Sequence, residues 1–262
     1  MKAKIVFIMP EEPSVVAHFF GRLMPQVEGQ IEAIAVVSPI YKNSSWFKQA
    51  KRFVGAFGMR AFIVEGSHFA KDVIADRIHS WFGIGSPHSI KGLAKDRGLR
   101  VLEPENVNDP EFLDTLRDIG PDLIISVSCP QIFKRELLEL PKITCVNVHS
   151  SLLPEYRGIL PTFWVLANDE KKTGVSVMYM NPGIDDGNLI VQGTIPITED
   201  ETLRSLMHKC KTTAADLVVQ TIRSFEDGTV TPLPNPEEEG SYFSFPKRED
   251  VARFRSLGRA MR

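Results

Sequence analysis

The sequence has few cysteines, no long apolar run and almost no net charge, and each of these absences excludes a class of protein. Its three cysteines, Cys129, Cys145 and Cys210, lie far apart and form neither a CxxC pair nor a metal-ligand spacing, so we expect reduced thiols, no metal and a cytoplasmic location. No stretch approaches the roughly 18 uncharged apolar residues of a membrane span. The short apolar opening MKAKIVFIMPEEP favours a buried strand over a signal peptide. A membrane partner is therefore not expected.

The charged residues nearly cancel, with 31 Lys and Arg against 33 Asp and Glu, for a formal net charge of -2. A chain of this kind has no global basic field with which to hold phosphate backbones, so bulk charge does not favour a nucleic-acid partner. The 262 residues, 43% of them hydrophobic, suffice for one large α/β domain or a domain with a small appendage.

Short apolar segments alternate with helical patterns through the first half of the chain. Amphipathic helices are expected around Ser14–Met24 and over Pro110–Asp118. The alternation predicts an α/β, Rossmann-like fold, a mostly parallel twisted sheet with helices on both faces. The expected strands are Lys4–Met9, Ile31–Val37, Leu99–Leu102, Asp122–Ser128 and Thr144–Val148.

Beyond residue 170 the pattern changes to two strands around a turn, then one long helix. The strands are expected at Gly174–Met180 and Gly187–Thr194, and the helix at Glu201–Phe225, with Gly228 just past its end. The Pro- and Glu-rich run TPLPNPEEEG follows, and then a basic, helix-forming tail from Arg248 to Arg262. We expect a catalytic domain over residues 1–228 and a small C-terminal extension over 229–262.

Residues 41–87 carry many aromatic side chains scattered among Lys, Arg and Asp on helix-like segments. They read as a helical insertion in the catalytic domain. One interpretation is extra helices packed on the sheet. The other is a cap that selects the acceptor, or the surface of a homodimer. Buried helices and a dimer surface have the same composition, so the sequence leaves both open.

Unusual chemistry is most concentrated in NVHSSLLPEYRGILP, from Asn147 to Pro161, directly after an apolar strand. Period-two spacing sets Asn147 and His149 on one side of the strand end, at the edge where open parallel sheets bind ligands. An amide donor beside an imidazole can stabilise the oxyanion of a tetrahedral intermediate, and imidazole carries protons at neutral pH. The alternative is a histidine that caps the strand and an asparagine that closes a turn.

A second cluster, Pro182-Gly183-Ile184-Asp185-Asp186-Gly187, sets two acids in a turn between predicted strands. One carboxylate near His149 would orient its ring and help it to relay a proton. Two adjacent acids are costly unless one faces water, so Asp186 is expected to be mainly a turn residue. Alternatively, both acids are solvated in an ordinary Asp-Gly turn.

Together, VNVHSSLLPEYRG and TGVSVMYMNPGIDDGNLIVQ resemble the signature of the folate-dependent formyltransferases, and the resemblance covers roughly residues 88–235. This family includes methionyl-tRNA formyltransferase, glycinamide ribonucleotide transformylase and the sugar N-formyltransferases. The resemblance implies that Asn147, His149 and Asp185 are catalytic. It also implies that 10-formyltetrahydrofolate is the co-substrate, with Asn147 and protonated His149 holding the oxyanion while Asp185 orders the site.

The resemblance further implies a pterin pocket made largely by main-chain groups of two loops, 128–133 and 181–185, with Ile132 and Leu152 along the ring faces. Cys129-Pro130 departs from the family's more usual aromatic-Gly pair. The implied folate-binding residues are Ser128, Cys129, Gln131, Ile132, Phe133, Leu152, Asn181, Gly183 and Ile184.

The acceptor is expected to be a small-molecule amine, first of all an amino sugar on a nucleotide carrier, and next a hydroxyornithine-like amine. Arg157 stands where glycinamide ribonucleotide enzymes usually have Lys, and it could bind a substrate phosphate or form a structural ion pair. Too few residues follow SYFSFPKREDV for the C-terminal barrel of the tRNA enzymes, so tRNA is disfavoured. Hydrolysis of 10-formyltetrahydrofolate is the further alternative.

Overall fold

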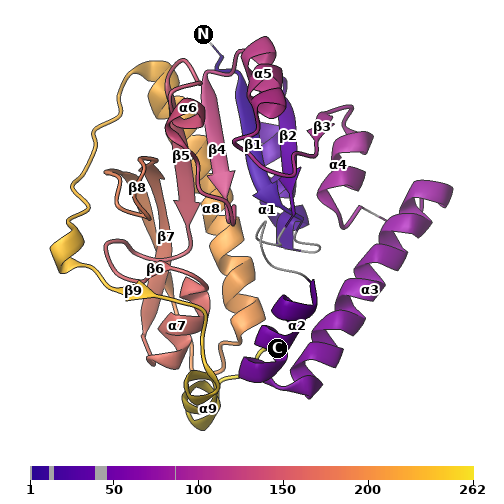
Figure 1. Ribbon diagram of the computed structural model, residues 1–262, viewed down its shortest axis with the longest axis vertical. Helices are drawn as coiled ribbons and strands as arrows, with labels where there is room; N and C mark the ends of the chain where they lie inside the picture. The colour runs from indigo at the N-terminus through magenta and orange to yellow at the C-terminus, as the bar shows by residue number, and fades with distance from the viewer. Residues whose placement is uncertain (1, 12–14, 39–45, 86) are drawn as a thin grey trace.

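The computed structural model describes residues 2–11, 15–38, 46–85 and 87–262, and a seven-stranded sheet lies at its centre (Figure 1). The strand order is β3-β2-β1-β4-β5-β7-β8; neighbours from β3 to β5 pair in parallel, and β7 is antiparallel to β5 and β8. This confirms the predicted fold class. The strands are β1 Ile5–Pro10, β2 Ile31–Val37, β3 Arg100–Leu102, β4 Leu123–Val127, β5 Thr144–His149, β7 Lys172–Tyr179 and β8 Leu189–Pro196.

Each central strand is apolar on both sides because helices cover both faces of the sheet. In β1, Phe7 and Met9 face one core, whereas Val6 and Ile8 face the other, as the period-two alternation of a strand requires. The first core contains α1 and α8, and the second contains α5 and α6. The helices are α1 Val15–Leu23, α2 Trp46–Phe57, α3 Met59–Phe82, α4 Ile90–Asp96, α5 Pro110–Ile119, α6 Arg135–Leu138, α7 Pro161–Ala167, α8 Leu203–Asp227 and α9 Arg248–Ser256.

The predicted long helix is α8, and its two ends show why it begins and stops where it does. Thr202 accepts a hydrogen bond from the Ser205 amide at 3.1 Å and caps the first turn. Gly228 follows the last residue in the left-handed conformation, with φ of 66°. The other predicted strands and helices of the sheet layer also form, with ends shifted by only a few residues.

The predicted insertion contains α2 and α3, although its residues 41–45 and 86 lie outside the described residues, as does Ser14 at the start of the predicted first helix. Ala56 and Phe57 of α2 join the main core. No residue of α3 is buried, so this helix does not pack on the sheet through an apolar face. It runs along the edge of the molecule in Figure 1.

The C-terminal segment returns across the carboxyl end of the sheet rather than trailing away from it (Figure 1). Its strand β9 (Tyr242–Phe243) pairs in parallel with β6 (Arg157–Gly158), directly after the predicted catalytic strand. Phe254 of α9 is buried in the main core. Among the described residues, no helix combines the length and apolar character needed to cross a membrane.

Candidate active site

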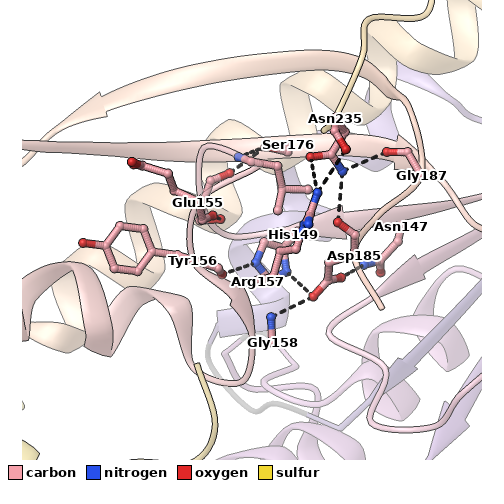
Figure 2. A network of polar contacts seen from close by, with 12 residues as sticks. Asn147, His149, Glu155, Tyr156, Arg157, Gly158, Ser176, Asp185, Gly187 and Asn235 are labelled. Carbon is pink, nitrogen blue, oxygen red and sulfur yellow. Dashed lines mark hydrogen bonds and ion pairs between the residues drawn. The ribbon is translucent and has the colours of Figure 1, made fainter. Parts of the chain in front are cut away.

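Asn147, His149 and Asp185 come together at one point, although Asp185 lies in the loop between β7 and β8 (Figure 2). Asn147 Nδ2 donates to Asp185 Oδ1 at 3.3 Å, and His149 Nδ1 lies 3.6 Å from Asp185 Oδ2. The side chains of His149 and Asp185 are 7% and 12% exposed. The structure therefore forms one nearly buried group from the three residues that the sequence proposed as catalytic.

The ring of His149 is oriented by a main-chain group. Its Nε2 lies 2.8 Å from the carbonyl oxygen of Tyr156, and because a carbonyl only accepts, Nε2 must carry a hydrogen. With Nε2 assigned in this way, Nδ1 faces Asp185. Nδ1 can accept a proton when the ring is neutral, and it donates a hydrogen bond when the ring is charged. Nδ1 is thus the atom of His149 that is available for chemistry.

Asp185 is held by its backbone as well as by its neighbours. Its φ is 53°, a left-handed conformation that is uncommon outside glycine, and Tyr156 is similarly left-handed at 60°. The amide of Gly158 donates to Asp185 Oδ2 at 2.9 Å. Gly158 has φ of 95°, and a Cβ there would collide with the carbonyl oxygen of Phe243. Left-handed residues held in this way are typical of functional sites.

The contacts among the three side chains are loose by hydrogen-bond standards. At 3.3 and 3.6 Å they exceed the usual optimum near 2.9 Å, whereas the Gly158 and Tyr156 contacts do not. Such distances are common in catalytic groups before substrate binds, and they tighten in the reacting complex. An amide donor, an imidazole and a carboxylate facing one point can stabilise an oxyanion and move a proton.

Asp186, the second acid of the turn, points elsewhere. Its carboxylate folds back over Gly183, where any Cβ would overlap it. Its Oδ1 is buried and has no hydrogen-bond partner within the described part of the chain. Of the two acids, the structure brings Asp185, and not Asp186, to Asn147 and His149.

The first loop proposed for folate, residues 128–133, combines exposed, half-buried and buried side chains. Ser128 Oγ accepts from Lys211 Nζ at 2.8 Å, and Gln131 Oε1 accepts from the Val107 amide at 2.9 Å. Phe133 is 2% exposed and belongs to the core beside α5 and α6. Cys129 is half-buried. Ile132 is the exposed large apolar residue of this loop, at 66% exposure, and can cover an apolar ring face.

The second proposed loop offers main-chain groups and another exposed apolar side chain. Asn181 Oδ1 accepts from the Gly183 amide at 3.1 Å and shapes the turn, and Ile184 is 51% exposed. Leu152, also proposed for the ring face, is half-buried and packs closely against Gly174 of β7.

Arg157 lies within the protein, not at its surface. The residue is 4% exposed, and its Nη2 donates to both the main-chain oxygen and Oδ1 of Asn235 at 3.0 Å. Its Nη2 also lies 3.4 Å from the Pro236 carbonyl oxygen. These partners favour a structural role for Arg157 over phosphate binding. The partners are neutral oxygens of the C-terminal segment, so the expected structural ion pair is replaced by hydrogen bonds.

Asn235 completes the site and was missed by the sequence reasoning. It is 6% exposed, and its Nδ2 donates to the carbonyl oxygens of Asp185 and Gly187 at 3.0 Å each (Figure 2). One amide side chain therefore joins Arg157 to the loop that carries Asp185. In a Pro- and Glu-rich run that resembles a linker, no local signal distinguishes this residue.

Neither a reactive thiol nor a metal cluster is found here. Burial raises the pKa of Cys129 to about 11 and that of Cys145 to about 12, so both remain protonated and weakly nucleophilic at neutral pH. Across residues 2–11, 15–38, 46–85 and 87–262, no three His, Cys, Asp or Glu side chains are grouped to hold a metal ion.

The fold and the site define a class of one-carbon transfer proteins, and the comparisons agree. The family model described as Formyl transferase matches residues 70–222, more than half of the chain. The chain therefore belongs to the formyl transferase family, as the resemblance predicted.

Curated relatives match a similar share of the chain. The methionyl-tRNA formyltransferase of Caldanaerobacter subterraneus subsp. tengcongensis is 38% identical over 154 residues, covering 58% of this chain and 50% of the relative. That of Clostridioides difficile is 39% identical over 153 residues, with coverages of 58% and 50%. The chain spans about half the length of these relatives.

Solved structures share the fold at low identity. A sugar 3N-formyl transferase, WlaRD, has a TM-score of 0.58 at 18% identity, over 93% of this chain and 70% of that one. Glycinamide ribonucleotide transformylase 1 from Symbiobacterium toebii has a TM-score of 0.57 at 15% identity, over 87% and 89%. Likeness at this level establishes the architecture only.

Proposed function

We propose that this protein transfers the formyl group of 10-formyltetrahydrofolate to a primary amine of a small molecule. The observation that carries the proposal is the convergence of Asn147 and His149 on the carboxylate of Asp185 in a nearly buried site. An amide donor, an imidazole and an acid are the groups that formyl transfer needs. Family membership supports the same reaction class.

The first step forms the new C–N bond. The amine nitrogen attacks the formyl carbon, and the carbonyl oxygen becomes an oxyanion. Asn147 Nδ2 and protonated His149 Nδ1 are placed to donate to it, because His149 Nε2 is already held by Tyr156. Removal of one such donor typically costs about 10²–10³ in rate.

The second step breaks the bond between the formyl carbon and N10. The attacking nitrogen loses one proton, and N10 gains one as it leaves, so the proton balance closes without another reagent. Asp185 can accept the first proton and return it, and the Gly158 amide, which donates to its Oδ2, holds the carboxylate in position for this relay. The products are a formamide and tetrahydrofolate.

The residues around the site fit a folate. A pterin edge is a row of donors and acceptors, and the loops at 128–133 and 181–185 present main-chain groups. Ile132 and Ile184 add exposed apolar surface that a planar ring would cover. We propose that these loops hold the folate through their main chain, with the inward-facing Gln131 and Phe133 holding the first loop in shape.

For the acceptor we propose an amino sugar on a nucleotide carrier. One similar structure, the N-formyltransferase from Helicobacter canadensis, is described in complex with folinic acid and dTDP-3-aminofucose; it has a TM-score of 0.58 and 18% identity, over 95% of this chain and 72% of that one. Methionyl-tRNA is the second candidate, because the curated relatives of 36 to 39% identity are methionyl-tRNA formyltransferases.

Incubation of the purified full chain with 10-formyltetrahydrofolate and a panel of amines tests both the proposed reaction and the proposed acceptor. Tetrahydrofolate formation that requires a nucleotide-linked amino sugar is the expected result. Turnover on initiator methionyl-tRNA and on no small amine would reverse the acceptor ranking while keeping formyl transfer. Fast, saturable formate release without any amine would show a hydrolase instead.

A further inference from the structure

Helix α3 turns its acidic side and not its apolar side toward the protein, which is the reverse of an ordinary surface helix. Its half-buried positions recur every three or four residues, as one stripe of a helix does. All three acids and both histidines of the helix lie in this stripe, facing the protein. The half-buried positions are Ala61, Phe62, Glu65, His68, Asp72, Ala75, Asp76 and His79.

Polar anchors along this stripe fix the orientation of the helix. Glu65 forms a two-bond ion pair with Arg262, at 2.9 and 2.7 Å. Asp76 accepts from the amides of His88 and Ser89, and His79 Nε2 lies 2.7 Å from Asp96 Oδ2. These contacts tie α3 to the C-terminus, to the residues just before α4 and to the last residue of α4. Its opposite face is therefore directed outward by the fold.

The outward face is apolar and basic. Arg60, Lys71 and Arg77 occupy exposed positions there, and no exposed position of α3 carries an acid. In an ordinary amphipathic helix the large apolar residues would face the core. In α3, Phe62 lies in the inward stripe, whereas the other large apolar residues are exposed by 36 to 73%: Met59, Ile63, Val64, Phe69, Val73, Ile74, Ile78, Trp81 and Phe82.

We propose that the outward face of α3 docks on an anionic lipid surface, with the helix lying in the plane of the membrane. A helix with large apolar side chains and Lys or Arg, but no acid, on its exposed face is suited to the interface between headgroups and acyl chains. Cations beside the apolar residues pair with anionic headgroups. This mode of binding requires no spanning helix.

A second copy of the chain fits this face less well. Symmetric pairing would bring the same patch of both copies together, so that Arg60, Lys71 and Arg77 would meet only other cations. The basic character also continues into α2, where Lys48, Lys51 and Arg52 occur and residues 46–64 contain no acid. Charge complementarity therefore selects an anionic surface as the partner.

Co-sedimentation of the full chain with vesicles tests the proposal. Binding is expected to vesicles of phosphatidylcholine with phosphatidylglycerol, to be weak with phosphatidylcholine alone, and to fall as salt is raised. The emission of Trp81, 73% exposed without lipid, should shift to the blue on binding, and Trp81→Phe should remove that shift.

Matched variants distinguish the contribution of the α3 face to vesicle binding from general effects of net charge and surface hydrophobicity. Arg60→Glu/Lys71→Glu/Arg77→Glu should weaken vesicle binding about a hundredfold. The control Arg117→Glu/Lys134→Glu/Arg135→Glu makes the same charge change on α5 and α6, at the opposite end of the sheet from α2 in Figure 1, and should bind more tightly than the α3 variant. Ile74→Ser/Ile78→Ser should also weaken binding, unlike Ile143→Ser/Leu257→Ser.

All substituted side chains are exposed, so circular dichroism should show folded protein in each case. Absence of vesicle binding by the unmodified chain would overturn the proposal. Equal loss of binding in the α3 variants and in their controls would also overturn it. A concentration-dependent dimer that Ile74→Ser/Ile78→Ser dissociates, without vesicle binding, would show that a second copy covers the face.

Discussion

Asn235 holds the main chain of Asp185 from 50 residues away in the sequence, by a hydrogen bond of 3.0 Å from its side-chain amide to the Asp185 carbonyl oxygen. The side-chain oxygen of Asn235, Oδ1, accepts a hydrogen bond from Nη2 of the buried Arg157. Arg157 belongs to the strand that presents the Gly158 amide to the Asp185 carboxylate. The C-terminal segment thus fixes both the backbone and the side-chain surroundings of the proposed catalytic acid.

Substitution of Asn235 by leucine should slow formyl transfer more than it weakens binding. Leucine keeps the volume but removes the bonds to Asp185, Gly187 and Arg157, so the acid-bearing loop loses its support. We expect a stability loss of about 1–3 kcal/mol from the unpaired buried groups. A misplaced acid should lower kcat about 10-fold to 100-fold with little change in KM. Steady-state kinetics and urea denaturation measure the two effects.

Gln30→Leu is the matched control for this positioning role. Gln30 is also a buried amide, 5% exposed, and donates to Glu226 at 2.6 Å, but it precedes β2, in the half of the sheet away from β7 and β8. It should destabilise the protein to a similar degree and leave kcat unchanged. Equal kcat in the two variants would assign Asn235 a purely structural role.

Substitutions of the three converging residues test the proposed chemistry directly. His149→Ala and Asp185→Asn should each reduce formyl transfer by about 10² or more, because one removes the imidazole and the other the proton acceptor. Asn147→Ala should have a comparable effect through the lost oxyanion donor. Asp186→Asn is the control, since that carboxylate points away from the site. Near-normal transfer by the His149 or Asp185 variant would contradict the assignment.

The two interpretations of Arg157 differ in what Arg157→Lys should do. Lysine lacks the planar guanidinium fork, so the contacts to Asn235 should weaken and the free energy of unfolding should fall by about 1–3 kcal/mol. A structural role predicts equal kinetic effects on acceptors with and without a phosphate. A selective rise in KM for the phosphorylated acceptor would restore the phosphate-binding interpretation.

The sheet could be predicted from the sequence because its signals are local, whereas the three converging residues were singled out by a combination of motifs that resembles the formyltransferase signature. Strands such as β1 and β4 are buried along their whole length and almost entirely apolar, since both faces are covered. Asn147 and His149 stand two residues apart at a strand end, and Asp185 lies in a recognisable turn. Each pattern is complete within a few residues.

Asn235 and the orientation of α3 could not be predicted because they depend on contacts between distant segments. The linker-like composition around Asn235 describes its neighbours and not its partners. Periodicity shows that α3 is a helix with two faces, but its orientation is set by polar anchors such as the ion pair of Glu65 with Arg262, which are 197 residues apart. Apolar spacing alone would have turned that helix the other way.

Two histidines should make opposite contributions to the pH dependence of stability. Burial, and then the charges of His18, Arg204 and Arg262, lower the pKa of His208 from its ordinary value of 6.5. The folded state therefore resists protonation of His208, and this contribution to stability is present above pH 6.5 and lost as pH falls through the lowered pKa. His208→Phe keeps the ring that meets His18 and should reduce the acid destabilisation.

The hydrogen bond to Asp96 raises the pKa of His79, so its contribution is present below pH 6.5 and lost as pH rises through the raised pKa. Relative to the unmodified chain, His79→Gln should therefore be less stable mainly below pH 6.5, whereas His208→Phe should be more stable there. Urea denaturation at a series of pH values on both sides of 6.5 measures both, because the two pKa values move in opposite directions from that ordinary value. Parallel curves of stability against pH for the unmodified chain and His79→Gln would show that the ion pair with Asp96 does not stabilise the fold. That outcome would also remove one of the anchors proposed to turn the apolar face of α3 outward.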